Sequence, residues 1–193
     1  MGDITTMTMS VPQDEHVWMG AIANGDMAAF EALVQRYHGT LYRLGMGWLG
    51  NPMDADELTQ DVLVGVWQHA HQFRGDSGIG RWLTVMAYRR MLSMRRRQRW
   101  RQWVSLDDGW PSPTIPDTSH VVGVSDAVQQ LLAALQALDP VSRDIMVLKE
   151  CEGWTHDEIA QFLHLNEGTV RSKLSRAKAT LRTQFPGLGD ADA

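Results

Sequence analysis

Apolar residues recur along this chain at the spacing of an α-helix, without the sustained alternation of apolar and polar residues that marks a half-buried strand. A helix places residues three and four positions apart on one face, so each apolar stripe must be buried against another helix. No pair of alternating runs flanks a hairpin turn either. We therefore predict an all-α fold.

Glycine, proline and capping residues divide the first half of the chain into separate helices. Asp26 has the side chain of a helix N-cap, and the run Gly50-Asn51-Pro52 ends one helix before the next begins. Residues 73–80 are too rich in glycine for a helix and form a loop. Helices are predicted over residues 13–23, 26–49, 53–72 and 81–101.

Residues 103–124 separate two parts of the chain, because they contain three prolines and no basic residue. We predict two small helical domains, residues 13–102 and 125–185, joined by this flexible acidic linker. Residues 1–12 form a disordered tail, and residues 186–193 form a second tail. Such a linker predicts that the two domains move freely until a partner fixes them.

Charge is distributed unevenly along the chain, although the formal net charge is −5. Residues 81–102 contain 8 arginines and no acidic residue, whereas residues 1–80 contain 10 acidic and 3 basic residues. A strongly basic block inside an acidic protein indicates an anionic ligand at that place. The alternative is an ordinary basic helix exposed to solvent.

The C-terminal domain is predicted to contain four helices. Asp139-Pro140 places a proline in the first turn of the second, and Thr155 with Glu158 forms a capping box for the third. After the short turn of residues 164–166, the last helix covers residues 167–185. Two short helices joined by such a turn, with a basic second helix, indicate a helix-turn-helix.

The last helix has an apolar face and a polar face. At about 100° per residue, one side carries Val170, Leu174, Ala177 and Leu181. The polar side carries arginine and hydroxyl groups, which bind base edges and phosphates in the major groove. We also expect the backbone amides at Gly168-Thr169 to approach a phosphate. The candidate DNA-binding residues of this helix are Thr169, Arg171, Ser172, Lys173, Ser175 and Arg176.

Two stretches resemble the conserved regions of bacterial RNA polymerase sigma factors. The residues that resemble the second conserved region are Asp54-x-Asp56-Glu57-Leu58-Thr59-Gln60-Asp61-Val62-Leu63-x-x-Val66-Trp67, Phe73-Arg74-Gly75 and Trp82-Leu83. The fourth is resembled by Gly153-Trp154-Thr155-x-x-Glu158-Ile159-Ala160 and Glu167-Gly168-Thr169-Val170-Arg171-Ser172-Lys173-Leu174-x-Arg176-Ala177. With both regions, a short linker and no domain between them, the chain resembles the extracytoplasmic-function (ECF) group.

This resemblance implies roles for both domains. The helix-turn-helix would read the −35 promoter element and meet the β flap of core RNA polymerase. The β′ clamp coiled coil would contact the third helix through Asp56, Gln60, Asp61, Val64 and Gln68. The −10 element would be bound and melted by Phe73, Arg74, Trp82, Tyr88, Arg89, Arg95 and Arg96. An anti-sigma factor that responds to envelope or metal stress would control the protein.

The fourth helix departs from the family pattern. Members usually carry an Ala-Arg-Asn stretch with a later Asp, but here Tyr88 and Arg89 follow Ala87, and Ser93 replaces the Asp. Arginine contacts to the backbone in place of that pair predict tighter and less selective −10 binding. In that case, replacing Arg95 and Arg96 with alanine should weaken binding to all −10 sequences alike.

Other functions have weaker support in the sequence. We predict no catalytic residues, no metal site, no cofactor and no membrane insertion, with a cytoplasmic location. The lone Cys151 is expected to be a buried thiol, and His156 is expected to belong to the capping box. A conventional helix-turn-helix regulator that binds DNA without polymerase, an enzyme that acts on nucleic acid, and a helical interaction module remain the alternatives.

Overall fold

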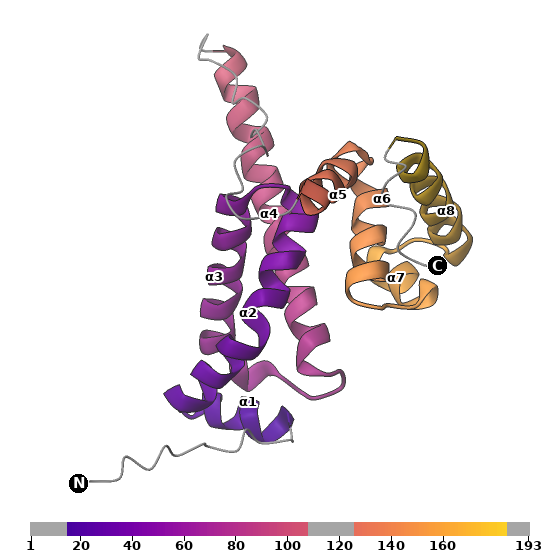
Figure 1. Cartoon of the computed structure of the whole chain (residues 1–193). Coiled ribbons are helices and arrows are strands. Elements are labelled where there is room, and N and C mark those ends of the chain that lie inside the picture. Colours follow the sequence, from indigo (N-terminus) through magenta and orange to yellow (C-terminus); the bar gives the residue numbers. More distant parts are fainter. Residues whose placement is uncertain (1–14, 108–125, 185–193) are drawn as a thin grey trace, which may run out of the picture.

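The computed structural model describes residues 15–107 and 126–184, and all regular secondary structure within these ranges is helical (Figure 1). This confirms the predicted all-α class. The elements are α1 (Glu15–Ala23), α2 (Met27–Leu49), α3 (Pro52–His69), the 3-10 turn η1 (Ala70–Gln72), α4 (Ile79–Asp107), α5 (Asp126–Ala137), α6 (Pro140–Met146), the π-helical turn η3 (Val147–Cys151), α7 (His156–Leu163) and α8 (Glu167–Gln184). The predicted tails lie outside the described residues.

The breaks in the first domain come from the residues that predicted them. Asp26 caps α2 by accepting a hydrogen bond from the Ala29 amide at 3.1 Å. Gly50 ends the same helix in the left-handed region, with φ of 78°, which glycine adopts without strain. Asn51 then caps α3 through the Asp54 amide at 2.8 Å.

Helices α2, α3 and α4 form a bundle, and α1 packs across one end of it (Figure 1). A Cβ atom on Gly45 would lie 2.8 Å from the Ala55 Cα, so glycine is what lets α2 and α3 approach closely there. The bundle core contains the fully buried Leu33, Leu41, Leu44, Trp48, Leu58, Ile79, Leu83 and Met91.

Helix α4 is longer than predicted at both ends. It begins at Ile79, two residues early, because the fully buried Ile79 side chain anchors its first turn in the core. It continues to Asp107 because no glycine or proline interrupts the chain before Gly109. The helix therefore enters the predicted linker, and residues 108–125 of that linker lie outside the described part of the chain.

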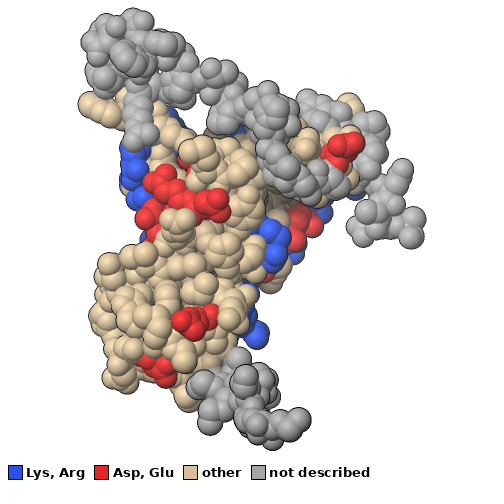
Figure 2. Space-filling model, turned by 60° about the vertical axis from the view of Figure 1, so that its left-hand side comes forward, with Lys and Arg blue, Asp and Glu red and all other residues tan. Residues whose placement is uncertain are grey.

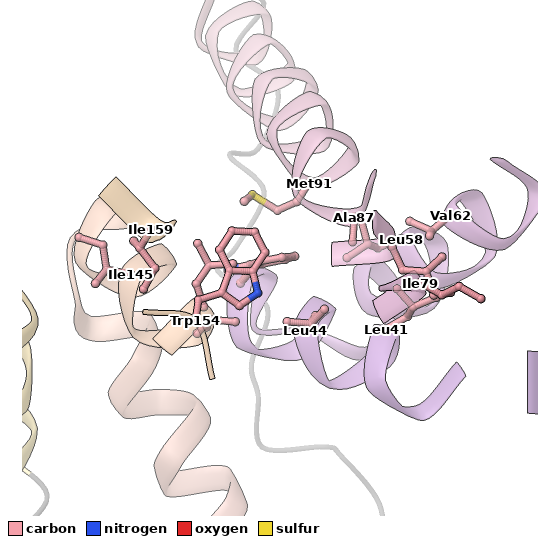
Figure 3. Packing of buried hydrophobic residues seen from close by; sticks show 14 of the residues in the cluster. Leu41, Leu44, Leu58, Val62, Ile79, Ala87, Met91, Ile145, Trp154 and Ile159 are labelled. Atoms are coloured by element: carbon pink, nitrogen blue, oxygen red, sulfur yellow. The ribbon is translucent and has the colours of Figure 1, made fainter. Parts of the chain in front are cut away.

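The C-terminal helices α5 to α8 pack beside the bundle rather than apart from it (Figure 1). Their core includes Ile145 and Ile159, and Trp154 lies between this core and that of the bundle (Figure 3). Buried residues of both domains form one continuous cluster. The domains are packed together in this arrangement because each buries apolar surface, including Trp154 and Val147, against the other. Their free movement in the absence of a partner stays a prediction.

The C-terminal end of α2 is the main contact point between the domains. A Cβ atom on Gly47 would lie 3.0 Å from Val147 Cγ2, so the small residue permits this packing. The last carbonyls of a helix lack partners within it and carry partial negative charge. Here Gln136 donates to the Gly47 carbonyl at 3.2 Å, and Arg143 donates to the Trp48 carbonyl at 3.2 Å. The second domain therefore caps a helix of the first.

Candidate nucleic-acid interface

Helix α8 presents the polar face that its sequence predicts. Val170, Leu174 and Ala177 are buried and hold α8 against α6 and α7. On the other side, four of the predicted DNA-binding residues are exposed: Arg171, Ser172, Ser175 and Arg176. Lys173 is half-buried beside them and pairs with Asp139 at 3.3 Å. The helix thus offers a row of cations and hydroxyls on a fixed apolar back.

The turn before α8 fixes the angle at which this face is presented. His164 ends α7 in the left-handed region, with φ of 55°. Asn166 then accepts hydrogen bonds from the Thr169 amide at 2.7 Å and from the Thr169 hydroxyl at 2.8 Å. The prediction of a phosphate at the Gly168-Thr169 amides is corrected in part, because the Thr169 amide is already occupied by this cap.

The capping box predicted for α7 is present, and it also connects the two domains. Glu158 accepts from the Thr155 amide at 2.7 Å, while the Thr155 hydroxyl accepts from the Glu158 amide at 3.2 Å. The same carboxylate pairs with Arg81 of α4 at 2.7 Å. The Thr155 amide and then the Arg81 guanidinium lower the pKa of Glu158 to about 2.

Replacing Glu158 with glutamine is expected to make stability less dependent on acid. A carboxyl whose pKa is lower in the folded state stabilises the fold above its ordinary pKa of 4.5, and this stabilisation is lost as the pH falls toward 2. Glu158→Gln should therefore cost about 1 kcal/mol near neutral pH and much less near about pH 3. Thermal unfolding at both pH values measures this, with Glu150→Gln as the control. An equal cost at both would contradict the prediction.

Helix α4 contains arginines in two different environments. Arg90 pairs with Glu57 and Asp61 of α3, and Arg97 pairs with Glu57 at 3.2 Å. Figure 2, which turns the α3 side forward, shows acidic side chains gathered beside basic ones on this face. By contrast, three arginines of α4 are exposed and form no ion pair within the described residues: Arg89, Arg96 and Arg99.

The loop before α4 provides the other predicted −10 residues. Phe73 and Trp82 are half-buried and meet edge to face, with ring centroids 5.7 Å apart. This favours packing over base stacking for Trp82. Arg74 is exposed beside them. The structure therefore brings Phe73, Arg74 and Trp82 together at the start of α4, with Arg89 and Arg96 farther along the same helix.

Two residues predicted for −10 binding, Tyr88 and Arg95, face the second domain instead. Arg95 donates to the Asp144 carboxylate at 3.1 Å, and the Tyr88 hydroxyl donates to it at 3.1 Å. The Arg95 and Asp144 side chains are only 12% and 5% exposed. In this arrangement neither residue is open to DNA, so their role at the −10 element stays a prediction that requires the second domain to move. Both are held there because the buried Asp144 carboxylate requires hydrogen-bond donors.

Burial affects the ionisation of this cluster. Burial raises the pKa of Asp144, although Arg95 and Tyr88 act in the opposite direction. Burial and then the Asp144 charge raise the pKa of Tyr88, which keeps its hydroxyl a neutral donor. Next to the cluster, Thr84 donates to Glu152 at 2.7 Å across the same interface. Burial likewise raises the pKa of Glu152.

Aromatic rings complete the contact between the domains. The Arg81 guanidinium lies 4.3 Å from the centroid of Trp154, and Tyr88 meets Phe162 edge to face at 5.0 Å. The sequence analysis missed this interface because each of its residues has an ordinary role when taken alone. Gly47 inside the amphipathic helix α2 was the available signal, since it permits close packing against Val147 of the second domain.

Four of the five residues predicted to bind polymerase lie on one exposed face of α3. Asp56, Gln60, Val64 and Gln68 follow at four-residue spacing and are all exposed, Val64 by 53%. They form one continuous stripe along the helix. Asp61 differs, because its carboxylate is paired with Arg90.

Other candidate features have no support among the described residues. No group of three or more histidine, cysteine or acidic side chains there could hold a metal ion. Cys151 is exposed, which corrects the expectation of a buried thiol. Within the same ranges, no helix is both long and apolar enough to span a bilayer.

Comparison with known proteins gives matches for both domains. The family model described as Sigma-70 region 2 matches residues 33–101, and the model described as Sigma-70, region 4 matches residues 128–181. The ECF RNA polymerase sigma factor SigM of Mycobacterium tuberculosis is 31% identical over 163 residues, which cover 84% of this chain and 80% of SigM.

Two solved structures share the fold. The sigma factor RpoE of Bartonella quintana, solved in complex with the anti-sigma factor NepR, superposes with a TM-score of 0.64 at 24% identity, covering 85% of this chain and 98% of that one. CnrH, solved in complex with the cytosolic domain of CnrY, superposes with a TM-score of 0.62 at 22% identity, covering 90% and 97%.

Proposed function

Because this chain belongs to the ECF group of the sigma-70 family of RNA polymerase sigma factors, we propose that it recruits core polymerase to promoters through two DNA-binding surfaces. Helix α8 reads the −35 element in the major groove. The single observation that carries this is the exposed row of Arg171, Ser172, Ser175 and Arg176 on an otherwise packed helix.

The second surface is the start of α4 with the loop before it, which takes up the −10 element. Arg74, Arg89 and Arg96 are exposed cations that suit the backbone of a melted strand. Tyr88 and Arg95 join this surface only if the second domain moves away from α4, because Asp144 holds both. Promoter binding is therefore accompanied by separation of the two domains.

Contacts with polymerase complete the proposal. The stripe of Asp56, Gln60, Val64 and Gln68 on α3 meets the β′ clamp coiled coil, and the C-terminal domain meets the β flap. An anti-sigma factor controls access to these surfaces, which is supported by the partners named in the RpoE and CnrH structures. The protein acts in the cytoplasm, beside polymerase, and catalyses no reaction itself.

Transcription with purified components tests the proposal. The full chain is mixed with sigma-free core polymerase and the DNA upstream of its own gene, and the transcripts are mapped. We expect a defined transcript that requires both proteins. Sequence-specific DNA binding by the chain alone, with no transcript, would instead establish a conventional helix-turn-helix regulator.

A further inference from the structure

A cavity of about 260 Å³ lies where the two domains meet near the end of α2. It is lined by three arginines, two glutamines and the last residues of α2: Arg95, Arg99, Arg143, Gln98, Gln136, Trp48 and Leu49. Among the described residues, no acidic side chain lines it. The arginines of α4 proposed above to contact the promoter, Arg89 and Arg96, do not line this cavity. The proposed function therefore gives the cavity no role.

The cavity has more positive charge than its surroundings neutralise. Arg95 and Arg143 both donate to the Trp48 carbonyl, at 2.9 and 3.2 Å, so the two guanidinium groups converge on one oxygen. Asp144 is the one carboxylate among the described residues that pairs with Arg95, and Arg143 has only carbonyl acceptors. Burial and then the Arg95 charge lower the pKa of Arg143. An anion placed here would relieve this repulsion.

Arg99, which lines the cavity, has unused hydrogen-bond donors. A guanidinium has five N–H groups, and Arg99 uses none of them for an ion pair within the described residues. Arginine binds phosphate through paired, charge-assisted hydrogen bonds. We propose that this cavity binds the phosphate groups of a small, multiply charged molecule between Arg95 and Arg99 of one domain and Arg143 of the other.

The position of the cavity limits what can occupy it. It is bounded by α2, α4 and the α5–α6 corner, so a compact phosphate or diphosphate group fits better than a nucleic-acid strand. Free polyphosphates and the phosphate end of a nucleotide share this chemistry. Since the ligand contacts both domains, it stabilises their packed arrangement and opposes the release of Arg95.

Titration of the full chain with inorganic pyrophosphate, followed by calorimetry and thermal unfolding, tests the site. We expect saturable binding at constant ionic strength and a rise in the unfolding temperature. Arg99→Ala should weaken the affinity about tenfold or more, since it removes a charge-assisted contact with phosphate. The control is Arg96→Ala, which removes another exposed arginine of the same helix that does not line the cavity.

Two further experiments test the site, one by separating the domains and one by changing the ligand. Gly47→Leu changes no arginine but is expected to force the two domains apart, because its side chain would collide with Val147. This variant should therefore abolish pyrophosphate binding. ATP binding equal to that of pyrophosphate identifies a site for phosphate alone, and tighter ATP binding identifies a nucleotide site. Three results would overturn the proposal. Arg99→Ala and Arg96→Ala could weaken binding equally, Gly47→Leu could leave binding unchanged, or neither pyrophosphate nor ATP could bind.

Discussion

Replacing both Arg171 and Arg176 with alanine is expected to reduce transcription from a promoter that has a −35 element by about 100-fold or more. Each arginine that pairs with a base contributes about 1–3 kcal/mol of discrimination, and two such losses combine. Both side chains are exposed on α8. The ion pair of Arg171 with Glu167 lies on the surface, so it competes only weakly with DNA binding. Run-off transcription with core polymerase measures the effect.

The fold should survive this double substitution. Both arginines lie away from the buried residues of α8, and surface substitutions of this kind change stability by about 0.5 kcal/mol or less. Arg182→Ala is the control for each single substitution, because it removes one arginine from the last turn of the same helix. An equal loss of transcription in the control would indicate a general charge effect instead of −35 reading. On a promoter with a scrambled −35 element, the double variant should resemble the unaltered protein.

The sequence predicts helix boundaries well where a single residue determines them. Asp26, Gly50 and Thr155 act through hydrogen bonds or dihedral angles within a few residues, so their effect is readable locally. The face of α8 was equally predictable, because helical geometry alone decides which side chains lie opposite Val170 and Leu174. Both predictions depend only on interactions between residues that are close together in the sequence.

The roles of the arginines on α4 were not predictable in the same way. All eight in residues 81–102 look alike in the sequence, but Arg90 pairs with α3, Arg95 is buried against Asp144, and Arg96 is exposed. These differences depend on residues 29 to 49 positions away. In the packed arrangement Arg96 is exposed and Arg95 is not, whereas the expectation that both contact −10 DNA regardless of its sequence stays a prediction.

Asp144→Ala is expected to separate the two domains without unfolding either of them. The substitution removes the carboxylate that accepts hydrogen bonds from Arg95 and Tyr88, and an unpaired buried charge costs about 3–5 kcal/mol. The chain can avoid this cost by moving the second domain away, which returns Arg95 to water. We expect a larger radius of gyration in small-angle scattering and two unfolding transitions in place of one.

Two other substitutions separate the loss of charge from the loss of packing. Asp144→Asn retains an acceptor of the same shape and should open the interface less, whereas Glu150→Ala removes an exposed acid from η3 and should leave it closed. Gly47→Leu keeps the ion pair but places side-chain atoms against Val147, so it should open the interface by sterics alone.

Separation of the domains should also change DNA binding by the free protein. Tyr88 and Arg95 become accessible in Asp144→Ala and in Gly47→Leu, so both variants should bind single-stranded −10 DNA more tightly than the unaltered chain. Fluorescence anisotropy with a labelled −10 strand measures this. If Asp144→Ala unfolded in one transition at a lower temperature, with an unchanged radius of gyration, the interface would be a fixed part of the core. In that case Tyr88 and Arg95 would have no role in promoter melting, and the exposed Arg74, Arg89 and Arg96 would contribute the −10 contacts.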